Sequence, residues 1–408
     1  MTFRNYDPDR DKDAVRRIWR ECGWLEPGKE EAMDLFVGAG RALVAELDGE
    51  AECLALTCPG TIRYLEEELP FGCVTGVTTS RVARKQGFAK RLTALAVAQD
   101  AADGALVEGL GMFEQGYYDQ LGFGAGGYEH WVAFDPAQLR VDVRARPPRR
   151  VGSDDWEKAH RARLARRPGH GRCNLTPAAV TRSDMAWTTG GFGLGYADGA
   201  GELTHHLWCS GKDEHGPYRI DWMAWHTRDE FLELLALVRA LGDQVRLIRM
   251  REPQGIQLQD LIVQPFRYYQ LTEKGKYEHK AEAFAYWQMR VNDVPACLAR
   301  TRLPAGRDLR FNLKLDDPIA RALDEKAPWR GCGGDYVVTL GRESGATPGR
   351  DKGLPTLACS VNAFTRMWLG AAPASGLGIT DTLAAPPDLI AALDWALLLP
   401  MPRPDWDF

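Results

Sequence analysis

A short apolar segment, a basic loop with one glycine and an amphipathic stretch follow one another closely in this chain. Residues 73–78 have the composition of a buried strand, and residues 84–89 (RKQGFA) form the loop. Residues 88–102 then repeat apolar side chains with a period of about 3.6. A strand that leads through a loop into a helix is typical of domains in which helices cover a sheet. The segment therefore predicts an α/β domain built around one sheet.

The neighbouring segments fit the same sheet. Residues 42–47 and 52–57 are apolar on either side of Asp48-Gly49, a dipeptide typical of a hairpin turn. Asp103-Gly104 ends the helical stretch, and residues 105–110 are again apolar, so a further strand is expected there.

Two changes in composition divide the chain into three predicted domains. Residues 144–150 (RARPPRR) favour an exposed linker, with a new helix beginning near Ser153, and residues 275–283 form a second, charged break. The predicted domains are 1–146, 147–285 and 286–408. In the second we expect a strand at 218–224, a helix at 229–241 and a strand at 244–250. The third should open with strands, continue with two helices and end in a proline-rich tail.

The composition excludes several classes of protein. The 51 basic and 56 acidic residues give a net charge of −5, so there is no overall electrostatic reason to bind nucleic acid. We find neither an apolar stretch of about 20 residues nor a signal peptide, and so expect a cytoplasmic protein that does not bind a membrane. The nine cysteines are scattered without a C-x-x-C pair, which argues against a disulfide framework and a zinc site; no metal is expected.

The basic loop has the features of an anion site. The first amides of a helix have no intrahelical acceptor, and the helix dipole adds positive potential at the same place. Gly87 and Ala89 would let the backbone approach a phosphate, while Arg84, Lys85, Lys90 and Arg91 supply charge. The loop matches neither G-x-x-x-x-G-K-[ST] nor G-x-G-x-x-G, so nucleotide hydrolysis and NAD binding are not indicated.

These segments resemble the GNAT superfamily of acyl-CoA-dependent N-acetyltransferases. The strand at 73–78, the R/Q-x-x-G-x-G/A loop at 84–89 and YYDQLGF at 117–123 follow one another in that family's order. The resemblance implies acetyl-CoA as co-substrate, with backbone groups of Val77 and Thr79 on the pantetheine and Tyr118 as the acid that protonates the leaving thiolate. The pyrophosphate would be held by Arg84, Lys85, Gln86, Gly87, Phe88 and Ala89.

The chemistry of Tyr118 is plausible without the family. Amine attack on a thioester needs a neutral amine, a polarised carbonyl and an acid for the thiolate. A phenol with an ordinary pKa of about 10 can donate to a thiolate whose ordinary pKa is about 8.5. The alternatives are that Tyr118 is a packed aromatic residue beside Gly122 and Phe123, or that Tyr117 has the role.

The whole chain resembles one branch of that superfamily, the enhanced intracellular survival (Eis) family. RRPG at 166–169 with Arg172, DWMA at 221–224 and WQMRVNDVPA at 287–296 carry this resemblance in the family's order. It implies a degenerate second GNAT domain, a sterol-carrier-protein-like third domain and a homohexamer. It also implies that the C-terminal carboxylate, here on Phe408, is the general base. Trp406 and Phe408 could anchor the proline-stiffened tail in the first domain; the alternative is a frayed tail.

The acceptor is the least defined part of this prediction. At Phe113 the family commonly has serine, so one polar contact is expected to be missing. By position, candidates for the substrate pocket are Trp24, Glu26, Asp34 and Asp407, and acidic and aromatic side chains suit a polyamine such as an aminoglycoside. Two alternatives stay open: N-acylation of another amine, such as a protein lysine or a biosynthetic intermediate, and a non-catalytic protein that binds an apolar ligand.

Overall fold

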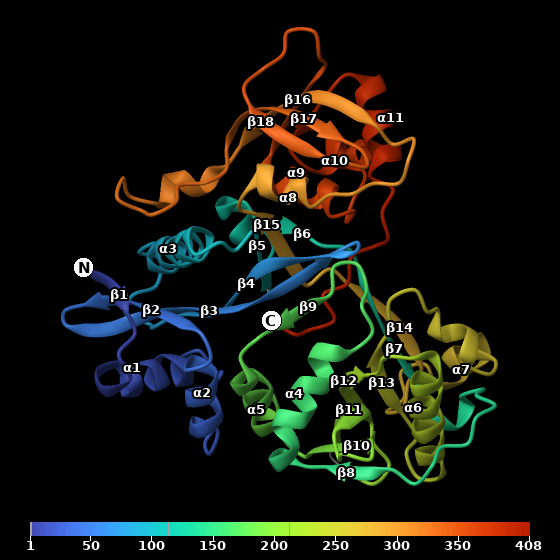
Figure 1. Cartoon of the computed structure of the whole chain (residues 1–408). Helices are drawn as coiled ribbons and strands as arrows, with labels where there is room; N and C mark the ends of the chain where they lie inside the picture. The colour runs from blue at the N-terminus through green and yellow to red at the C-terminus, as the bar shows by residue number, and fades with distance from the viewer. Residues whose placement is uncertain (1, 113, 212) are drawn as a thin grey trace. The chain divides into compact units, whose positions relative to one another are not determined.

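The computed structural model describes residues 2–112, 114–211 and 213–408 (Figure 1). Within these ranges the strands form three sheets, of eight, seven and five strands, with helices packed on them. The predicted mixed α/β class is therefore confirmed. The chain divides into two compact units. One contains the residues up to Gly127, Gly169–Pro177 and the residues from Ala285 onward, and the other contains Tyr128–Pro168 and Ala178–Phe284. None of the helices in the described ranges is both long enough and apolar enough to cross a membrane.

The first unit contains the sheet that the sequence predicted around residues 73–78. Its strand order is β1-β2-β3-β4-β5-β15-β6, with β9 paired to β3, and the β4–β5 pair is parallel. The strands are β1 (Thr2–Asn5), β2 (Arg41–Leu47), β3 (Glu50–Tyr64), β4 (Glu67–Thr79), β5 (Val107–Gly111), β6 (Gly124–Ala125), β9 (Cys173–Leu175) and β15 (Trp287–Val291).

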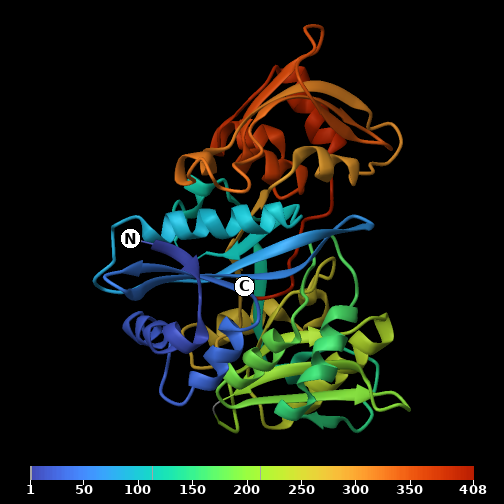
Figure 2. The same ribbon diagram turned by 60° about the vertical axis from the view of Figure 1, so that its left-hand side comes forward.

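Helices cover both faces of this sheet (Figure 2). Helices α1 (Pro8–Glu21) and α2 (Glu30–Val37) lie on one face, and α3 (Phe88–Ala102) lies on the other. Helix α1 begins where the Asp7 side chain accepts a hydrogen bond from the Asp9 amide, with Pro8 at the first helical position. The apolar side of α3 packs on β2 and β3 through Phe88, Leu92 and Ala96. The predicted helix at 88–102 is confirmed.

The sheet opens between its two parallel strands. Strand β5 pairs with β4 from Phe71 to Val74 only, whereas β4 continues to Thr79. Gly76 lies in a bulge of β4 with a φ of 60°. Within the described residues, one edge of β4 after Val74 therefore has no partner strand and leaves its backbone groups available to another molecule.

A second sheet in the first unit belongs to the C-terminal part of the chain. Its strands lie in the order β18-β17-β16-β19-β20, namely β16 (Leu309–Asp316), β17 (Gly334–Leu340), β18 (Gly345–Pro348), β19 (Thr356–Ser360) and β20 (Leu383–Ala384). The helices of this part are α8 (Val294–Ala299), α9 (Val361–Trp368), α10 (Ala374–Thr380) and α11 (Pro387–Ala396). Our expectation of two helices was wrong, because helices of six to ten residues are too short to show a clear period.

The second unit is a single sheet in the order β14-β7-β13-β12-β11-β10-β8. Helix α6 covers one face and α4 the other. The strands are β7 (Glu129–Phe134), β8 (Arg149–Val151), β10 (Gly191–Ala197), β11 (Leu203–Gly211), β12 (Tyr218–Ala224), β13 (Ile248–Arg251) and β14 (Lys280–Phe284). The helices are α4 (Trp156–Ala165), α5 (Ala178–Trp187), α6 (Arg228–Ala240) and α7 (Pro265–Thr272).

Strands from opposite sides of each predicted domain boundary pair in the same sheet. Strand β7 precedes residue 146 but pairs with β13 and β14 of the second unit. Strand β15 follows residue 285 but pairs with β5 of the first unit. The predicted linker at 144–150 also contributes residues to β8, because Arg149 and Arg150 pair with β10 despite their charge.

Candidate active site

The basic loop lies at the start of α3, as the sequence predicted. Residues Arg84, Lys85, Gln86 and Gly87 are exposed, and Phe88 is buried under the helix. The first hydrogen bond that enters the helix is donated by the Arg91 amide to the Gly87 carbonyl. The amides of residues 88–90 therefore have no intrahelical acceptor and are directed at the space in front of the loop. With no acidic residue in its first turn, the helix end is suited to a phosphate.

Gly87 has a specific role in this loop. Its φ is +80°, in the left-handed region that glycine adopts at little cost, and no heavy atom lies within 4 Å of where a Cβ would stand. The space beside Gly87 is therefore open to a ligand. Around it, Lys90 Nζ donates to Gln120 Oε1 at 2.8 Å, and the Arg91 guanidinium lies 4.9 Å from the centre of the Phe3 ring.

The end of β4 contains the two residues expected to bind pantetheine. Val77 packs against the core under α3, and Thr79 Oγ1 lies 3.3 Å from Cys53 Sγ. The Cys22 thiol donates to the Thr79 carbonyl at a longer distance of 3.7 Å. Both residues follow Val74, where pairing with β5 stops, so their backbone groups border the open edge of the strand.

Tyr118 lies on the face of the sheet that carries α3. It is the first residue of a short 3-10 helix, η1 (Tyr118–Leu121), and its ring is buried against Val74 of β4, Leu110 of β5 and the side of α3. Burial raises the pKa of Tyr118 above its ordinary value, so the phenol stays protonated at neutral pH. Within the part of the chain that the structure describes, no hydrogen bond from the Tyr118 hydroxyl is found. The neighbouring Tyr117 is half-buried, and burial raises its pKa to about 12.

The last residue of the chain lies on the opposite face. The Phe408 ring is 5.8 Å from the ring of Phe71, and the Phe408 main-chain oxygen lies 3.0 Å from where a Cβ on Gly111 would stand. Gly111 ends β5, and the Phe71 side chain also fills the space over Gly109 of that strand. The main-chain oxygen of Phe408 therefore approaches the sheet next to the place where β4 and β5 separate.

The tail that ends in Phe408 is fixed by several contacts. Trp406 is 1% exposed, the Cys173 amide donates to the Pro404 carbonyl at 2.8 Å, and the Arg403 amide donates to the His170 carbonyl at 3.0 Å. The Tyr286 hydroxyl and Asp407 Oδ1 are 3.2 Å apart and hydrogen-bonded. The tail is ordered by these bonds rather than frayed.

Aromatic side chains of α1 and α2 pack on the same face as Phe408. Trp19 lies 3.4 Å from the Cβ position of Gly76, and its ring makes edge contacts with Phe36 and Trp24 at 5.9 and 5.6 Å. Leu56, which pairs with Thr75, also faces Gly76, and alternation along β3 and β4 puts Phe71 on this face too. Trp24, a predicted substrate residue, is 38% exposed at the edge of this aromatic group.

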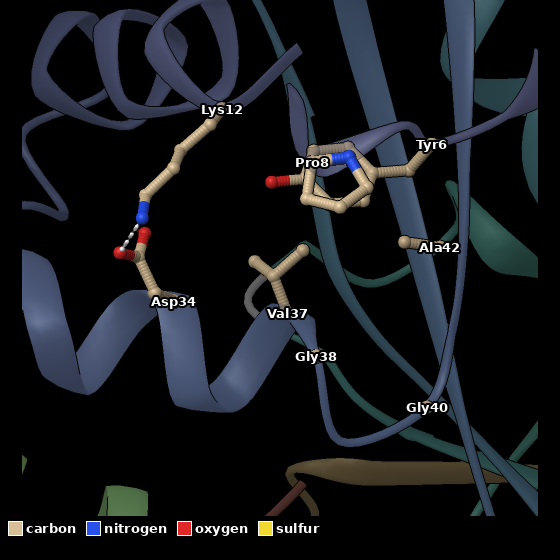
Figure 3. Close-up of a pocket in the computed structure, with 8 residues that line it drawn as sticks. All are labelled: Tyr6, Pro8, Lys12, Asp34, Val37, Gly38, Gly40 and Ala42. Atoms are coloured by element: carbon tan, nitrogen blue, oxygen red, sulfur yellow. Dashed lines mark ion pairs between the residues drawn. The ribbon is translucent and has the colours of Figure 1, made fainter. Parts of the chain in front are cut away.

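The structure gives Asp34 a different environment from the one expected of a substrate residue. Its carboxylate forms ion pairs with Arg16 at 2.5 Å and with Lys12 at 2.9 Å. Figure 3 shows Lys12 and Asp34 meeting beside a pocket of about 250 Å³, which is also lined by Tyr6, Pro8, Val37, Gly38, Gly40 and Ala42. Because two cations already compensate Asp34, we leave it out of the acceptor site. Glu26 is exposed, and Phe113 lies outside the described residues.

Several residues near the candidate site carried no recognisable signal in the sequence. Asn362 of α9 donates to two carbonyls of the Tyr118 turn, and Gln288 of β15 donates to a side chain of the same turn. His170 and Tyr286 hold the tail. Each is far from its partner in sequence, and a single buried amide or imidazole has no characteristic spacing. No group of three or more potential metal ligands occurs among the residues that can be described.

The arrangement permits transfer of a group through the sheet. The basic loop at 84–89 and Tyr118 are associated with the α3 face, and the main chain of Phe408 and the aromatic side chains lie on the α1–α2 face. The unpaired edge of β4 separates the two. A donor bound from one face could be attacked by an acceptor from the other, with an acid near the leaving group and a carboxylate near the nucleophile.

Comparison with known proteins supports this interpretation. The family model for an acetyltransferase (GNAT) domain matches residues 3–126. No curated protein sequence matches the chain significantly. Among solved structures, Eis1 from Mycobacterium abscessus is 16% identical with a TM-score of 0.76, covering 100% of both chains.

Two further structures match over nearly the whole chain. A protein from Enterococcus faecalis, described as a probable N-acyltransferase, is 14% identical with a TM-score of 0.77 and 98% coverage of each chain. A GCN5-related N-acetyltransferase from Kribbella flavida is 18% identical with a TM-score of 0.72, covering 100% of this chain and 98% of that one. At these identities the similarity establishes the fold. Residues 3–126 thus match the acetyltransferase (GNAT) domain, and over its full length the chain has the fold of Eis1.

Proposed function

We propose that this protein is an acetyl-CoA-dependent N-acetyltransferase that acetylates primary amines of a small polyamine of aminoglycoside type. Transfer is direct, in a ternary complex of enzyme, acetyl-CoA and amine. The observation that carries the proposal is the position of Phe408, whose main-chain oxygen lies over Gly111 where β4 and β5 separate. A carboxylate at that place can accept a proton from the acceptor amine while the acetyl donor is bound on the other face of the sheet.

The donor site is proposed at the start of α3. Arg84, Lys85 and the amides of residues 86–89 bind the pyrophosphate, because this helix end is open, basic and free of acidic neighbours in its first turn. The pantetheine arm follows β4, where backbone groups of Val77 and Thr79 take the place of the missing partner strand. This puts the thioester near Tyr118 and brings its carbonyl carbon to the opening.

The reaction we propose returns the enzyme to its starting state. The neutral amine nitrogen forms a bond to the thioester carbon, and the carbon–sulfur bond then breaks. The departing thiolate takes a proton from the Tyr118 hydroxyl, and the amine gives up a proton to the Phe408 carboxylate through water. A carboxylate with an ordinary pKa of about 3.3–3.7 is a weak base, so it needs a water relay or partial desolvation to take this proton. Proton exchange with solvent restores both groups, and free CoA and an acetamide are released.

Direct transfer is favoured over an acyl-enzyme. The cysteines of β3 and β4 are buried, and burial raises the pKa of Cys53 to about 11 and that of Cys73 well above its ordinary value. Both are therefore thiols at neutral pH, and a thiol is a far weaker nucleophile than a thiolate.

The acceptor class rests on charge and shape. Asp407 and the C-terminal carboxylate are neighbouring acidic groups in the chain, and the Phe408 ring contacts Phe71 on the α1–α2 face. Trp24, which contacts Trp19 on that face, and Glu26 are exposed. Such a surface attracts a ligand with several ammonium groups. The protein is expected to act in the cytoplasm, where acetyl-CoA is available.

The test measures thiol release from acetyl-CoA with aminoglycosides, linear polyamines and lysine peptides as acceptors. Three C-terminal variants separate the ring from the carboxylate: Phe408→Ala, deletion of Phe408, and addition of one glycine after Phe408. We expect the last two to lower kcat by about 100-fold or more, because both move the carboxylate, and Phe408→Ala to lose less. Thermal unfolding of each variant checks that the fold is retained.

Other results would change the proposal. Turnover on lysine peptides alone would replace the acceptor class with protein lysine. Full activity after deletion of Phe408 would remove its carboxylate from the mechanism. If calorimetry detected no binding of acetyl-CoA, the proposed enzymatic activity would be contradicted. The alternative of a non-catalytic binding protein would then remain.

A further inference from the structure

We propose that Asn362, from the C-terminal part of the chain, is a positioning residue for Tyr118. It holds the turn that carries the tyrosine through two hydrogen bonds from one amide group. The inference rests on the proposed function, because it gives Asn362 an effect on catalysis by Tyr118. Asn362 is about 240 residues away in sequence from the turn that it contacts.

The contacts of Asn362 are specific to the turn. Its Nδ2 donates to the Asp119 carbonyl at 3.0 Å and to the Phe123 carbonyl at 2.8 Å. The first acceptor belongs to the second residue of η1, directly after Tyr118, and the other lies two residues beyond the end of the helix. One amide group therefore holds both the beginning of η1 and the chain that follows it. Asn362 is itself held at the start of α9 and is 8% exposed.

Two other side chains from β15 act on the same turn. Gln288 Nε2 donates to Asp119 Oδ1 at 2.6 Å, and the Arg290 guanidinium donates to the Leu121 carbonyl. Arg290 is in turn paired with Asp317 at 2.7 Å, and both side chains are almost fully buried. The turn thus receives donors at three of its carbonyl groups and at one carboxylate, all from residues beyond position 285.

The backbone of the turn is closely packed against these donors. Gly122 ends η1 with a φ of +85°, and a Cβ there would lie 2.6 Å from Val361 and 2.8 Å from Arg290. At Gly124 a Cβ would lie 2.5 Å from the Asn362 carbonyl. The turn cannot move toward α9, and the hydrogen bonds prevent it from moving away. This leaves one position for the Tyr118 ring between β4, β5 and α3.

A shift of the ring by about 1 Å can cost about 100-fold in rate when the group must meet a reacting atom. The bonds made by Asn362 are therefore expected to affect kcat more than the binding of acetyl-CoA, whose proposed contacts lie on the loop at 84–89 and on β4.

The chain offers a matched control in Asn312. Its Nδ2 also donates to two carbonyls, those of Asp351 at 2.8 Å and Leu354 at 3.0 Å, and the residue is 4% exposed. Asn312 lies on β16 and fixes the loop between β18 and β19 of the C-terminal sheet. A change at Asn312 removes the same kind of bond from the same region without acting on Tyr118.

The experiment compares Asn362→Asp and Asn362→Ala with Asn312→Asp and Asn312→Ala in the full chain. Each Asp variant keeps the shape of the side chain but replaces the amide donor with a carboxylate oxygen, an acceptor that faces two carbonyl oxygens. We expect both pairs to lower the unfolding temperature. Only the Asn362 variants should lower kcat, by about 10- to 100-fold, with KM for acetyl-CoA changed less than about threefold.

A second readout does not depend on catalysis. Tyrosinate absorbance is titrated in each protein and in its Tyr118→Phe counterpart, so that the difference reports Tyr118 alone. Tyr118 is surrounded by the titratable groups of Tyr117 and Cys53, and Lys90 and Arg290 face the same turn. Its pKa is raised mainly by burial, so release of the turn should move its titration to lower pH. No such movement is expected in the Asn312 variants.

Each outcome is decisive. Equal kcat and equal Tyr118 titration in the Asn362 and Asn312 variants would overturn the positioning role. Undiminished kcat in Tyr118→Phe would show that Tyr118 is not the acid and would also overturn it, with the acetyltransferase activity intact. If the wild-type protein acetylated no amine, the proposed function would fail, and the titration alone would decide whether Asn362 positions Tyr118.

Discussion

At the scale of single residues, the interior of the first sheet contains a buried carboxyl group, that of Glu108. Glu108 is on β5 and is completely buried. Asn292 Nδ2 donates to its Oε1 at a long 3.5 Å, and its Oε2 has no hydrogen-bond partner among the described residues. Burial raises the pKa of Glu108 well above its ordinary value, the nearby Asp100 adds to this, and Arg290 opposes it.

The raised pKa predicts a pH-dependent effect of Glu108→Gln. Below the unfolded pKa of about 4.3 the group is protonated in both states and costs nothing. As the pH rises above that value, the unfolded chain ionises first. Stability is then lost at about 1.4 kcal/mol per pH unit until the folded pKa is reached. Glu108→Gln removes this loss, so the variant should be more stable than wild type at neutral pH, and the two should converge near pH 4.

Denaturant unfolding at several pH values measures this difference. The matching change Glu26→Gln, at an exposed site, should leave stability nearly unchanged throughout. A Glu108→Gln variant that is less stable than wild type at neutral pH would mean that the carboxylate is ionised and paired in the folded protein.

The residues of the candidate site differ in how far the sequence could predict them. Gly87 and Tyr118 belong to local patterns that combine a residue type with a spacing, and the structure gives both an environment consistent with the expected one. Asn362 and Glu108 acquire their properties only from contacts across the fold. Asp34 was selected by its position and charge, and the chain order could not reveal that Arg16 and Lys12 would compensate it.

At the scale of elements, helix α3 provides a direct test of the phosphate site. Gly87 precedes its first residue with a φ of +80° and Gly104 follows its end with a φ of +99°, and neither has a heavy atom within 4 Å of a Cβ position. Alanine at either position should cost about 1 kcal/mol of stability through backbone strain alone. Only Gly87→Ala should raise KM for acetyl-CoA, because only this Cβ would enter the phosphate site.

Steady-state kinetics and thermal unfolding of the two variants give the comparison. Equal KM values in Gly87→Ala, Gly104→Ala and wild type would exclude the start of α3 as the pyrophosphate site. A similar rise in both variants would indicate a general distortion of α3 instead of a local contact.

Elements with strong periodicity could be predicted, and elements made by distant pairing could not. The helix at 88–102 and the strand at 218–224 have clear local patterns and are found at the expected residues. Strand β4 was predicted too short, since residues 67–72 contain charged residues and proline but pair along β3 as a long hairpin. Strand β15 completes the first sheet by pairing with β5, about 180 residues earlier in the chain. No local sequence pattern encodes such a distant pairing.

At the scale of the whole molecule, the resemblance to Eis leads us to propose a homohexamer. The described residues include large apolar side chains that remain exposed in the single chain, among them Ile379 (86%), Trp395 (61%) and Leu398 (62%). Exposed apolar surface of this kind is often covered by association. Light scattering after size exclusion should give six times the 45.4 kDa of one chain. A mass of 45.4 kDa across the accessible concentration range would contradict the proposal.

The pairing of β15 with β5 also has a consequence for synthesis of the chain. When residues up to Gly127 leave the ribosome, β5 is an open edge with unpaired amides and carbonyls. The strand that covers it follows about 160 residues later, which is roughly 8 to 30 seconds at translation rates of about 5–20 residues per second. During that interval the nascent acetyltransferase domain is exposed to wrong pairing. Its yield in the cell should therefore depend on chaperones and on the speed of translation through the second unit.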